Sequence, residues 1–435
     1  MNLGTSNDQI FAGIKIFVLI LLLTANTYAM IISIIILLSL LLLQIKWVAD
    51  KSSSQFFDAD LLQSIEDEIN GLKQNEYDVY LQKINKIFTQ YNINVDYVET
   101  KVTNQLIIFY YKLGYAFKSG QKRYTKIADV TGVLKEINLT LGLEAKLITG
   151  ANKIGISIKN PNAKTILFTD LYKEPAYKKF VKENKKRLPF FLGTNVDGQV
   201  VSADLTKAPH ILVAGETNSG KSTALHVLLT SLLLNKKPTE LKLALADFKL
   251  VELSVYKNSK YLYAPVVTTI DGFEKLLDRV LNEMEERLVL FEKLSVKDIQ
   301  QFNEISDKPL PYILFVLEEL ASVTLMDDKK LKVELENKLA RLISKCRAAG
   351  INIIITVQKA NNDIIPTVIK TNLSSRLALK VESTADSNLM IGSSTAKDLL
   401  GQGDAIFKTN NNQIRLQCAY LSTKDHADLL KDKLN

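Results

Sequence analysis

A Gly-rich segment between an apolar run and a predicted helix constrains this chain more than any other feature. It reads Gly215-Glu216-Thr217-Asn218-Ser219-Gly220-Lys221-Ser222, which is the pattern of a phosphate-binding loop. Glycines let backbone N–H groups wrap a polyphosphate, and the following helix points its positive N-terminus at the anion. Residues 211–214 supply the strand and residues 221–234 the helix. This context favours a nucleotide site over a Gly-rich turn that binds nothing.

The chemistry of such loops assigns roles to their last residues. Lys221 is expected to contact the β- and γ-phosphates of ATP, and the Ser222 hydroxyl is expected to ligate Mg²⁺. ATP and Mg²⁺ are therefore the predicted ligands. The residues predicted to contact the nucleotide are Gly215, Glu216, Thr217, Asn218, Ser219, Gly220, Lys221, Ser222 and Thr223.

Two acidic residues end a second apolar run. Residues 312–317 are followed by Glu318 and Glu319, and a strand that ends in two acids brings one carboxylate near a metal and the other near an attacking water. We predict that Glu318 binds Mg²⁺, through water, and that Glu319 activates the water.

Two further polar residues are candidates for the same site. Gln358 follows the apolar run 351–357, where its amide can sense a γ-phosphate or simply cap a helix or loop. Arg347 ends a predicted helix before that run. It is either an arginine that reaches a neighbour's nucleotide or an ordinary surface arginine.

The order of predicted elements indicates a parallel α/β core. Apolar strands at 211–214, 241–246, 312–317 and 351–357 alternate with helices, as in a sheet buried on both faces. The helix before the third of these strands is predicted to start with Asp271 as its N-cap and Glu274 completing a capping box.

The first fifty residues are apolar and carry few charges. Lys15 and Lys46 are the only charges from residue 10 to residue 48, and this stretch is too long for a single span of about 20 residues. We predict a transmembrane hairpin over 1–48, with spans at 11–23 and 30–48. A signal peptide followed by one anchor is the alternative, but no small-residue cleavage site is evident. Since Lys46 and Lys51 follow the second span, we expect a multi-pass cell-membrane protein whose N-terminus and large C-terminal part are cytoplasmic.

Three segments are predicted after the hairpin: a juxtamembrane helical segment at 49–98, a small α/β accessory domain at 99–188, and a domain at 189–435 that carries the phosphate-binding loop. The accessory domain is predicted from strands at 106–111, 145–148 and 154–158 and a helix at 127–141. The lysine-rich run 172–187 either contacts DNA or forms a solvated helix face. A formal net charge of +8 favours an anionic partner, nucleic acid or membrane, over a basic surface without a partner.

Several short blocks resemble the FtsK/SpoIIIE family of DNA-pumping ATPases. The resemblance implies a RecA-like motor domain that assembles into a ring, usually a hexamer, with ATP between subunits and DNA through the centre. It also implies that Glu318 and Glu319 are the acidic pair and that Arg347 acts in trans. The blocks are 192–193, 198–201, 203–205, 209–215, 247–249, 252–256, 282–287, 347–351 and 399–404.

Departures from the family pattern indicate which kind of family member this sequence resembles. Glu318 replaces the usual Asp, and Lys359-Ala360 replaces Arg-Pro after Gln358. The chain ends soon after the last predicted motor strand, so we expect no orientation-reading winged-helix domain. The pattern is then similar to the TcpA-like coupling ATPases of Gram-positive conjugative elements, which implies a relaxase and channel proteins as partners. Alternatives are a chromosome or plasmid segregation pump, a protein-secretion ATPase, and a non-hydrolysing anchor.

Overall fold

The structure is a computed structural model that describes residues 77–118, 121–149, 153–410 and 412–434. The predicted transmembrane hairpin and residues 49–76 of the predicted juxtamembrane segment lie outside the described residues. Among the residues that are described, no helix is long and apolar enough to cross a membrane. The described residues divide into two compact units, one built from 77–99 and 109–156, the other from 100–108 and 157–434.

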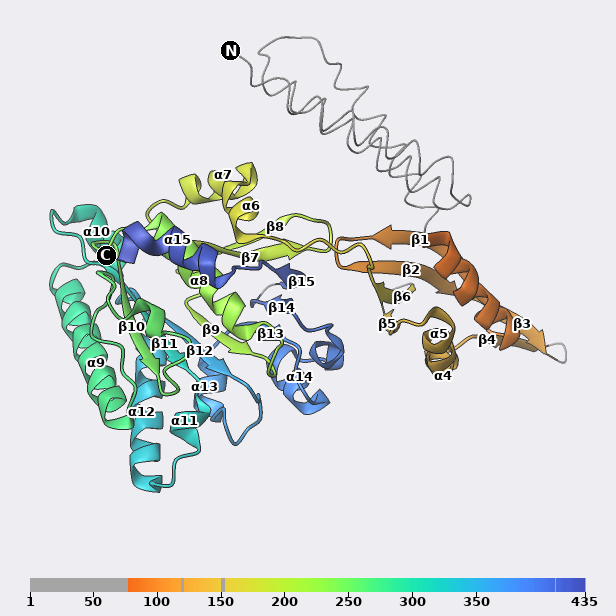
Figure 1. Cartoon of the computed structure of the whole chain (residues 1–435). Coiled ribbons are helices and arrows are strands. Elements are labelled where there is room, and N and C mark those ends of the chain that lie inside the picture. The colour runs from red at the N-terminus through yellow and green to blue at the C-terminus, as the bar shows by residue number, and fades with distance from the viewer. Residues whose placement is uncertain (1–76, 119–120, 150–152, 411, 435) are drawn as a thin grey trace, which may run out of the picture. The chain divides into compact units, whose positions relative to one another are not determined.

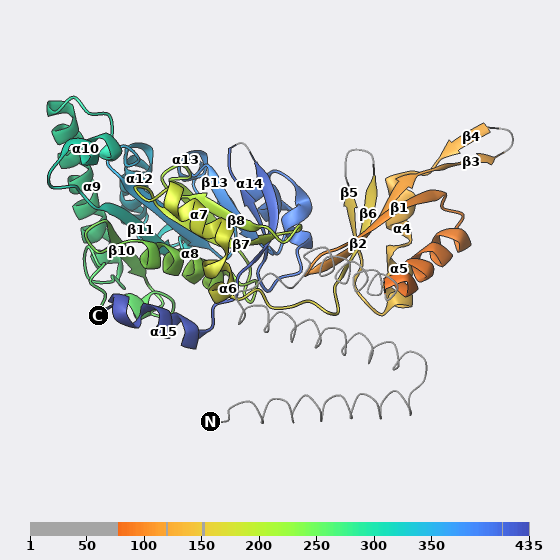
Figure 2. The ribbon, with the colours of Figure 1, turned by 90° about the horizontal axis from the view of Figure 1, so that it is seen from above.

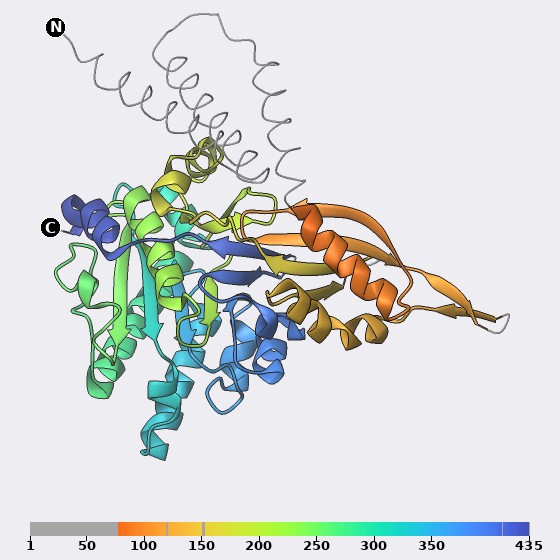
Figure 3. The ribbon, with the colours of Figure 1, turned by 45° about the vertical axis from the view of Figure 1, so that its right-hand side comes forward.

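The smaller unit combines a helix at residues 77–90 with short strands and helices. The sheet has the order β1-β2-β6-β5, and β3 pairs with β4 as a separate hairpin. Figure 3 shows the helix lying across the sheet, where Phe88 packs edge-on against Tyr111. The elements are β1 (Val95–Val102), β2 (Leu106–Leu113), β3 (Tyr115–Lys118), β4 (Gln121–Tyr124), α4 (Ile127–Gly132), α5 (Leu134–Leu141), β5 (Lys146–Thr149) and β6 (Ile154–Lys159).

Two details of this unit differ from the sequence-based prediction. The single helix predicted over 127–141 is broken at Val133, whose ψ of 2° ends α4 and begins α5. The domain boundary predicted between residues 98 and 99 falls inside β1. Tyr111 donates a hydrogen bond to Asn85 Oδ1 over 3.0 Å, so the helix at 77–90 contacts the part of β2 that lies in this unit.

A nine-stranded sheet lies at the centre of the larger unit (Figure 1). Its strand order is β10-β11-β12-β9-β13-β14-β15-β7-β8. The first five strands run parallel, and the last four extend the sheet in antiparallel pairs. The strands are β7 (Pro189–Asn195), β8 (Val200–Asp204), β9 (His210–Ala214), β10 (Leu241–Asp247), β11 (Tyr312–Glu318), β12 (Ile351–Val357), β13 (Ser375–Leu379), β14 (Asp404–Lys408) and β15 (Gln413–Cys418).

Helices cover both faces of this sheet, which explains the unbroken apolar runs of its central strands. Strand β9 sends Leu212 and Ala214 into one core with α9, α12, α13 and α14. It sends Ile211 and Val213 into the other core with α8 and α15, and Figure 2 shows α15 lying beside α8. The helices are α6 (Phe168–Lys173), α7 (Pro175–Glu183), α8 (Lys221–Asn235), α9 (Ile270–Lys293), α10 (Ile299–Ile305), α11 (Ala321–Thr324), α12 (Lys329–Lys345), α13 (Thr367–Asn372), α14 (Thr384–Ile391) and α15 (Thr423–Leu434).

The predicted cap of α9 is wrong. Thr269 has the extended backbone of an N-cap, and its hydroxyl accepts the Gly272 N–H, whereas Asp271 already lies in the first helical turn. Glu274 does not complete a capping box and instead pairs with Lys338 at 3.0 Å. Thr and Asp are both favoured at N-caps, and only the backbone conformation shows that Thr269 has this position.

Candidate nucleotide-binding site

The carboxyl ends of the parallel strands bring the predicted site residues to one edge of the sheet. Asp247 at the end of β10 lies in register with Glu318 at the end of β11, and β9 and β12 end beside each other at Ala214 and Val357. Loops that follow parallel strands meet at this edge, which is where α/β proteins bind ligands. The phosphate-binding loop therefore lies beside the acidic pair.

Two glycines are required by the close packing of this loop. A Cβ on Gly215 would lie 2.4 Å from Ser219 Oγ, and a Cβ on Gly220 would lie 2.7 Å from the backbone nitrogen of Gly403. Gly220 also has φ of +98°, a conformation that residues with a Cβ rarely adopt. The Gly403 N–H donates a 2.7 Å hydrogen bond to the Ser219 carbonyl, so the segment before β14 braces the loop.

Lys221 is at the centre of the site and is only 9% exposed. Its Nζ lies 3.4 Å from Glu318 Oε1 and 3.7 Å from Glu319 Oε2, and it donates to Thr356 Oγ1 over 3.3 Å. The structure thus brings three predicted site residues together. Burial raises the pKa of Glu318, while the Lys221 ammonium opposes that shift.

Glu319 is fixed in an unusual backbone conformation. Its φ of +66° is in the left-handed region, which carries a strain of about 1–3 kcal/mol for such a residue. Contacts hold it there: its N–H donates to Thr356 Oγ1 over 3.2 Å, and its Oε1 accepts the Gln358 N–H over 3.3 Å. The Lys249 Nζ lies 3.6 Å from Glu319 Oε2. This turn directs both acids toward Lys221.

The other predicted residues of the loop lie around this centre. The Ser222 hydroxyl donates a 2.6 Å hydrogen bond to Glu252 Oε1, and Glu216 pairs with Lys380 at 3.4 Å. Thr217 and Asn218 are exposed at the tip, and Thr223 is half-buried in the first turn of α8. Their contacts with a nucleotide stay predictions, as does phosphate sensing by the exposed Gln358 side chain.

Buried polar atoms in the site fit a bound cation and phosphate. Glu318 Oε2 and Ser219 Oγ are buried without a hydrogen-bond partner among the described residues, and such groups normally have one. No group of three or more His, Cys, Asp or Glu side chains in the described part of the chain could hold a metal ion. Mg²⁺ would therefore be held by Ser222, Glu318 and phosphate oxygens together.

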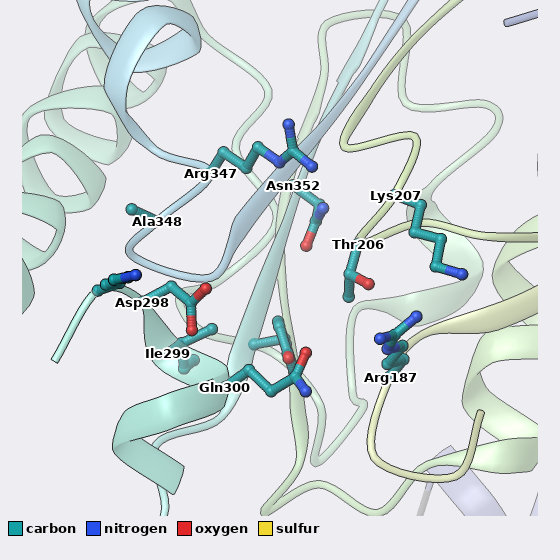
Figure 4. A pocket seen from close by; sticks show the side chains of 11 residues that line it. Arg187, Thr206, Lys207, Asp298, Ile299, Gln300, Arg347, Ala348 and Asn352 are labelled. Carbon is teal, nitrogen blue, oxygen red and sulfur yellow. The ribbon is translucent and has the colours of Figure 1, made fainter. Parts of the chain in front are cut away.

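Arg347 lies away from this site. It precedes β12 and lines a pocket of about 340 Å³ with Arg187, Lys207 and Lys297 (Figure 4). This pocket is at the amino ends of the parallel strands, one strand length or roughly 20 Å from their carboxyl ends. The structure therefore does not place Arg347 beside its own subunit's Lys221.

Sequence reasoning missed four residues that contact the predicted site: Thr356, Lys249, Glu252 and Gly403. Lys249 and Glu252 follow the strand at 241–247 just as Glu318 and Glu319 end β11, so the rule that strand ends meet could have found them. Thr356 is inside an apolar run, and nothing in the sequence distinguishes it.

Comparisons with known proteins find similar sequences. Residues 173–361 match the model of the FtsK/SpoIIIE family. The chain is 37% identical over 322 residues to a DNA translocase FtsK of Staphylococcus aureus, a match that covers 70% of this chain and 40% of the relative. A DNA translocase FtsK of Streptococcus pneumoniae is 38% identical over 306 residues, covering 66% and 39%. The chain thus spans about 40% of the length of these relatives.

Solved structures share the fold. The pCW3 conjugation coupling protein TcpA, solved with ATPgS, is 24% identical with a TM-score of 0.57, and the alignment covers 80% of this chain and 98% of that one. The cytoplasmic domain of the Type VII secretion ATPase EccC of Thermomonospora curvata is 19% identical with a TM-score of 0.51, over 62% and 35%. The fold is therefore that of a mixed α/β phosphate-loop ATPase, and residues 173–361 of this chain carry the FtsK/SpoIIIE family domain.

Proposed function

We propose that this chain is a membrane-anchored, ATP-driven DNA translocase that delivers DNA to a conjugative transfer channel. The observation that carries the proposal is the convergence of Lys221, Glu318 and Glu319 at the carboxyl edge of the sheet, beside a phosphate-binding loop whose close packing requires Gly215 and Gly220. These residue types perform ATP hydrolysis in phosphate-loop motors.

Each residue has a distinct part in hydrolysis. Lys221 and the loop N–H groups hold the β- and γ-phosphates, and the strained turn at Glu319 positions its carboxylate to take a proton from the attacking water. Ser222 and Glu318 would hold Mg²⁺, and the bound ion would supply positive charge beside the phosphate oxygens. Glu318 has one methylene more than the Asp usual in the family, and we expect slower hydrolysis as a result.

Charge and family support DNA as the substrate. The formal net charge is +8, and the relatives that are 37–38% identical are named DNA translocases. Lys178, Lys179 and Lys182 are exposed on α7, so this helix is a candidate for contact with the phosphate backbone.

The conjugative role rests on the N-terminal hairpin predicted at residues 1–48 and on the likeness in fold to TcpA over nearly all of that protein. We propose a hexameric ring at the cell membrane, with the N-terminus and the motor domain in the cytoplasm and with a relaxase and channel proteins as partners. A segregation pump is the second candidate, because the relatives with the highest quoted identities are named FtsK.

Hydrolysis by the purified full-length protein tests the enzymatic part. We expect ATPase activity that double- or single-stranded DNA stimulates, and that Lys221→Ala abolishes. In cells, deletion of the gene should reduce plasmid or element transfer without a defect in nucleoid segregation. Hydrolysis that no DNA stimulates would contradict a DNA motor, and a segregation defect with normal transfer would favour the second candidate.

A further inference from the structure

The hydroxyl predicted to bind Mg²⁺ already has a hydrogen-bond partner. Ser222 Oγ donates to Glu252 Oε1 over 2.6 Å, and the other Glu252 oxygen lies 3.6 Å from His226 Nε2. A serine hydroxyl that gives its proton to a carboxylate keeps both lone pairs available for a cation. Glu252 can therefore orient Ser222 toward Mg²⁺ without binding the ion itself.

The backbone around Glu252 fixes its position. Asp247 at the end of β10 accepts hydrogen bonds from the N–H groups of Lys249, Glu252 and Leu253 at 2.9–3.1 Å. Asp247 is fully buried, so these hydrogen bonds attach the segment that carries Glu252 to the end of β10. The carboxylate is thus held by the fold and not by Ser222 alone.

Hydrogen bonds connect His226, the neighbour of Glu252, to the C-terminal helix. His226 Nδ1 lies 3.0 Å from the Tyr256 hydroxyl, which lies 3.1 Å from His426 Nε2 on α15. Tyr256 is fully buried and His426 is 6% exposed. The rings of His226 and His426 are also in contact, with centroids 4.8 Å apart. Side chains from α8, the segment after β10 and α15 therefore form one partly buried series of contacts that ends at Ser222.

Donor and acceptor chemistry shows which side chain donates and which accepts at each step from His426 to Glu252. A carboxylate beside His226 Nε2 favours a proton on that nitrogen, which leaves Nδ1 to accept the Tyr256 O–H. The tyrosine oxygen then accepts from His426 Nε2–H. Burial, with the neighbouring His226, lowers the pKa of His426 to about 4, so that its imidazole is neutral at physiological pH. The Nε2–H of each histidine and the Tyr256 hydroxyl then each have an acceptor in this series of side chains.

We propose that Glu252, held by His226, Tyr256 and His426, is a positioning residue that sets the affinity of Ser222 for Mg²⁺. The inference rests on the proposed nucleotide site and goes beyond it, because it makes α15 a control element for the metal. Carboxylates that hold a metal ligand from outside typically change metal affinity 10- to 100-fold when they are altered.

The test is a Mg²⁺ titration of binding of a fluorescent ATP analogue to the full-length protein. Glu252→Gln should raise the half-saturating Mg²⁺ concentration about 10- to 100-fold and leave binding in EDTA within about twofold of wild type. Tyr256→Phe keeps the ring but removes the connecting hydroxyl, and it should raise the Mg²⁺ requirement at least about threefold by loosening Glu252.

Tyr261→Phe is the matched control. Tyr261 is also fully buried in the same core, but its hydroxyl donates to the Lys236 carbonyl at 2.6 Å and not to a histidine. This variant should lose stability while keeping the wild-type Mg²⁺ response. The inference is overturned if Glu252→Gln and Tyr256→Phe titrate like wild type, or if Tyr261→Phe shifts the titration as much as Tyr256→Phe does. Wild-type protein that binds no nucleotide in Mg²⁺ would overturn the proposed function as well.

Discussion

Replacement of Gly220 by alanine tests the packing of the phosphate-binding loop. Gly220 has φ of +98°, and a Cβ in this left-handed region costs about 1–2 kcal/mol. That Cβ would also lie 2.7 Å from the Gly403 nitrogen, so the backbone must shift. The shift breaks the hydrogen bond from Gly403 N–H to the Ser219 carbonyl, which stabilises by about 1 kcal/mol or more.

The summed cost for Gly220→Ala is about 2–4 kcal/mol. Since nucleotide binding needs the native loop, the affinity for a fluorescent ATP analogue should fall by about 30- to 1000-fold. Gly198→Ala is the control, because Gly198 has φ of +79° but nothing within 4 Å of its added Cβ. It should lower the free energy of unfolding by about 1–2 kcal/mol without changing nucleotide affinity.

Equilibrium titration for affinity and urea denaturation for stability separate the two contributions. The reasoning is refuted if Gly220→Ala binds the nucleotide within about threefold of wild type, a difference below 1 kcal/mol. It is also refuted if Gly198→Ala weakens nucleotide binding as much, because the contact with Gly403 would then have no role.

Three further predictions concern other parts of the motor. Burial lowers the pKa of His210 from 6.5 to about 4, so between these pH values the unfolded protein binds a proton that the folded protein does not. The free energy of unfolding should therefore fall by up to about 3 kcal/mol as the pH drops from 6.5 to 4. In denaturation curves at several pH values, His210→Asn should remove this pH-dependent loss of stability. Asp404 accepts from Arg415 Nη2 at 2.7 Å and Nε at 3.1 Å, so Asp404→Ala should cost about 2–4 kcal/mol in urea denaturation, whereas a loss below 0.5 kcal/mol would show that the pair contributes little. Arg347→Ala should keep nucleotide affinity but lower kcat about 1000-fold, and mixing it with Lys221→Ala subunits should restore activity only if the arginine acts across a subunit interface.

The parallel part of the fold could be predicted because its signals are local. Residues 211–214 and 312–317 are unbroken apolar runs that end in a glycine or an acid, and parallel strands buried on both faces have this pattern. The antiparallel extension was not predicted. Strand β15, with Arg415 and Gln417 in its middle, has too weak a hydrophobic pattern to be assigned without its neighbours.

The site residues that belong to sequence motifs could be predicted from the sequence. Lys221, Glu318 and Glu319 each stand in a recognisable local pattern, and the structure brings both carboxylates within 3.7 Å of Lys221 Nζ. The hydrogen bond from Ser222 to Glu252 joins residues 30 positions apart, and it depends on which strands are neighbours in the sheet. Sequence spacing does not carry that information.

DNA movement by the full-length protein tests the central claim most directly. A third strand annealed to a linear duplex is displaced when a motor travels along that duplex, and its release is followed by electrophoresis. We predict ATP-dependent displacement by the wild-type protein. Glu319→Gln should give no displacement although it still binds nucleotide, because Glu319 is the proposed base. Vigorous hydrolysis with no displacement on any DNA substrate would contradict the account.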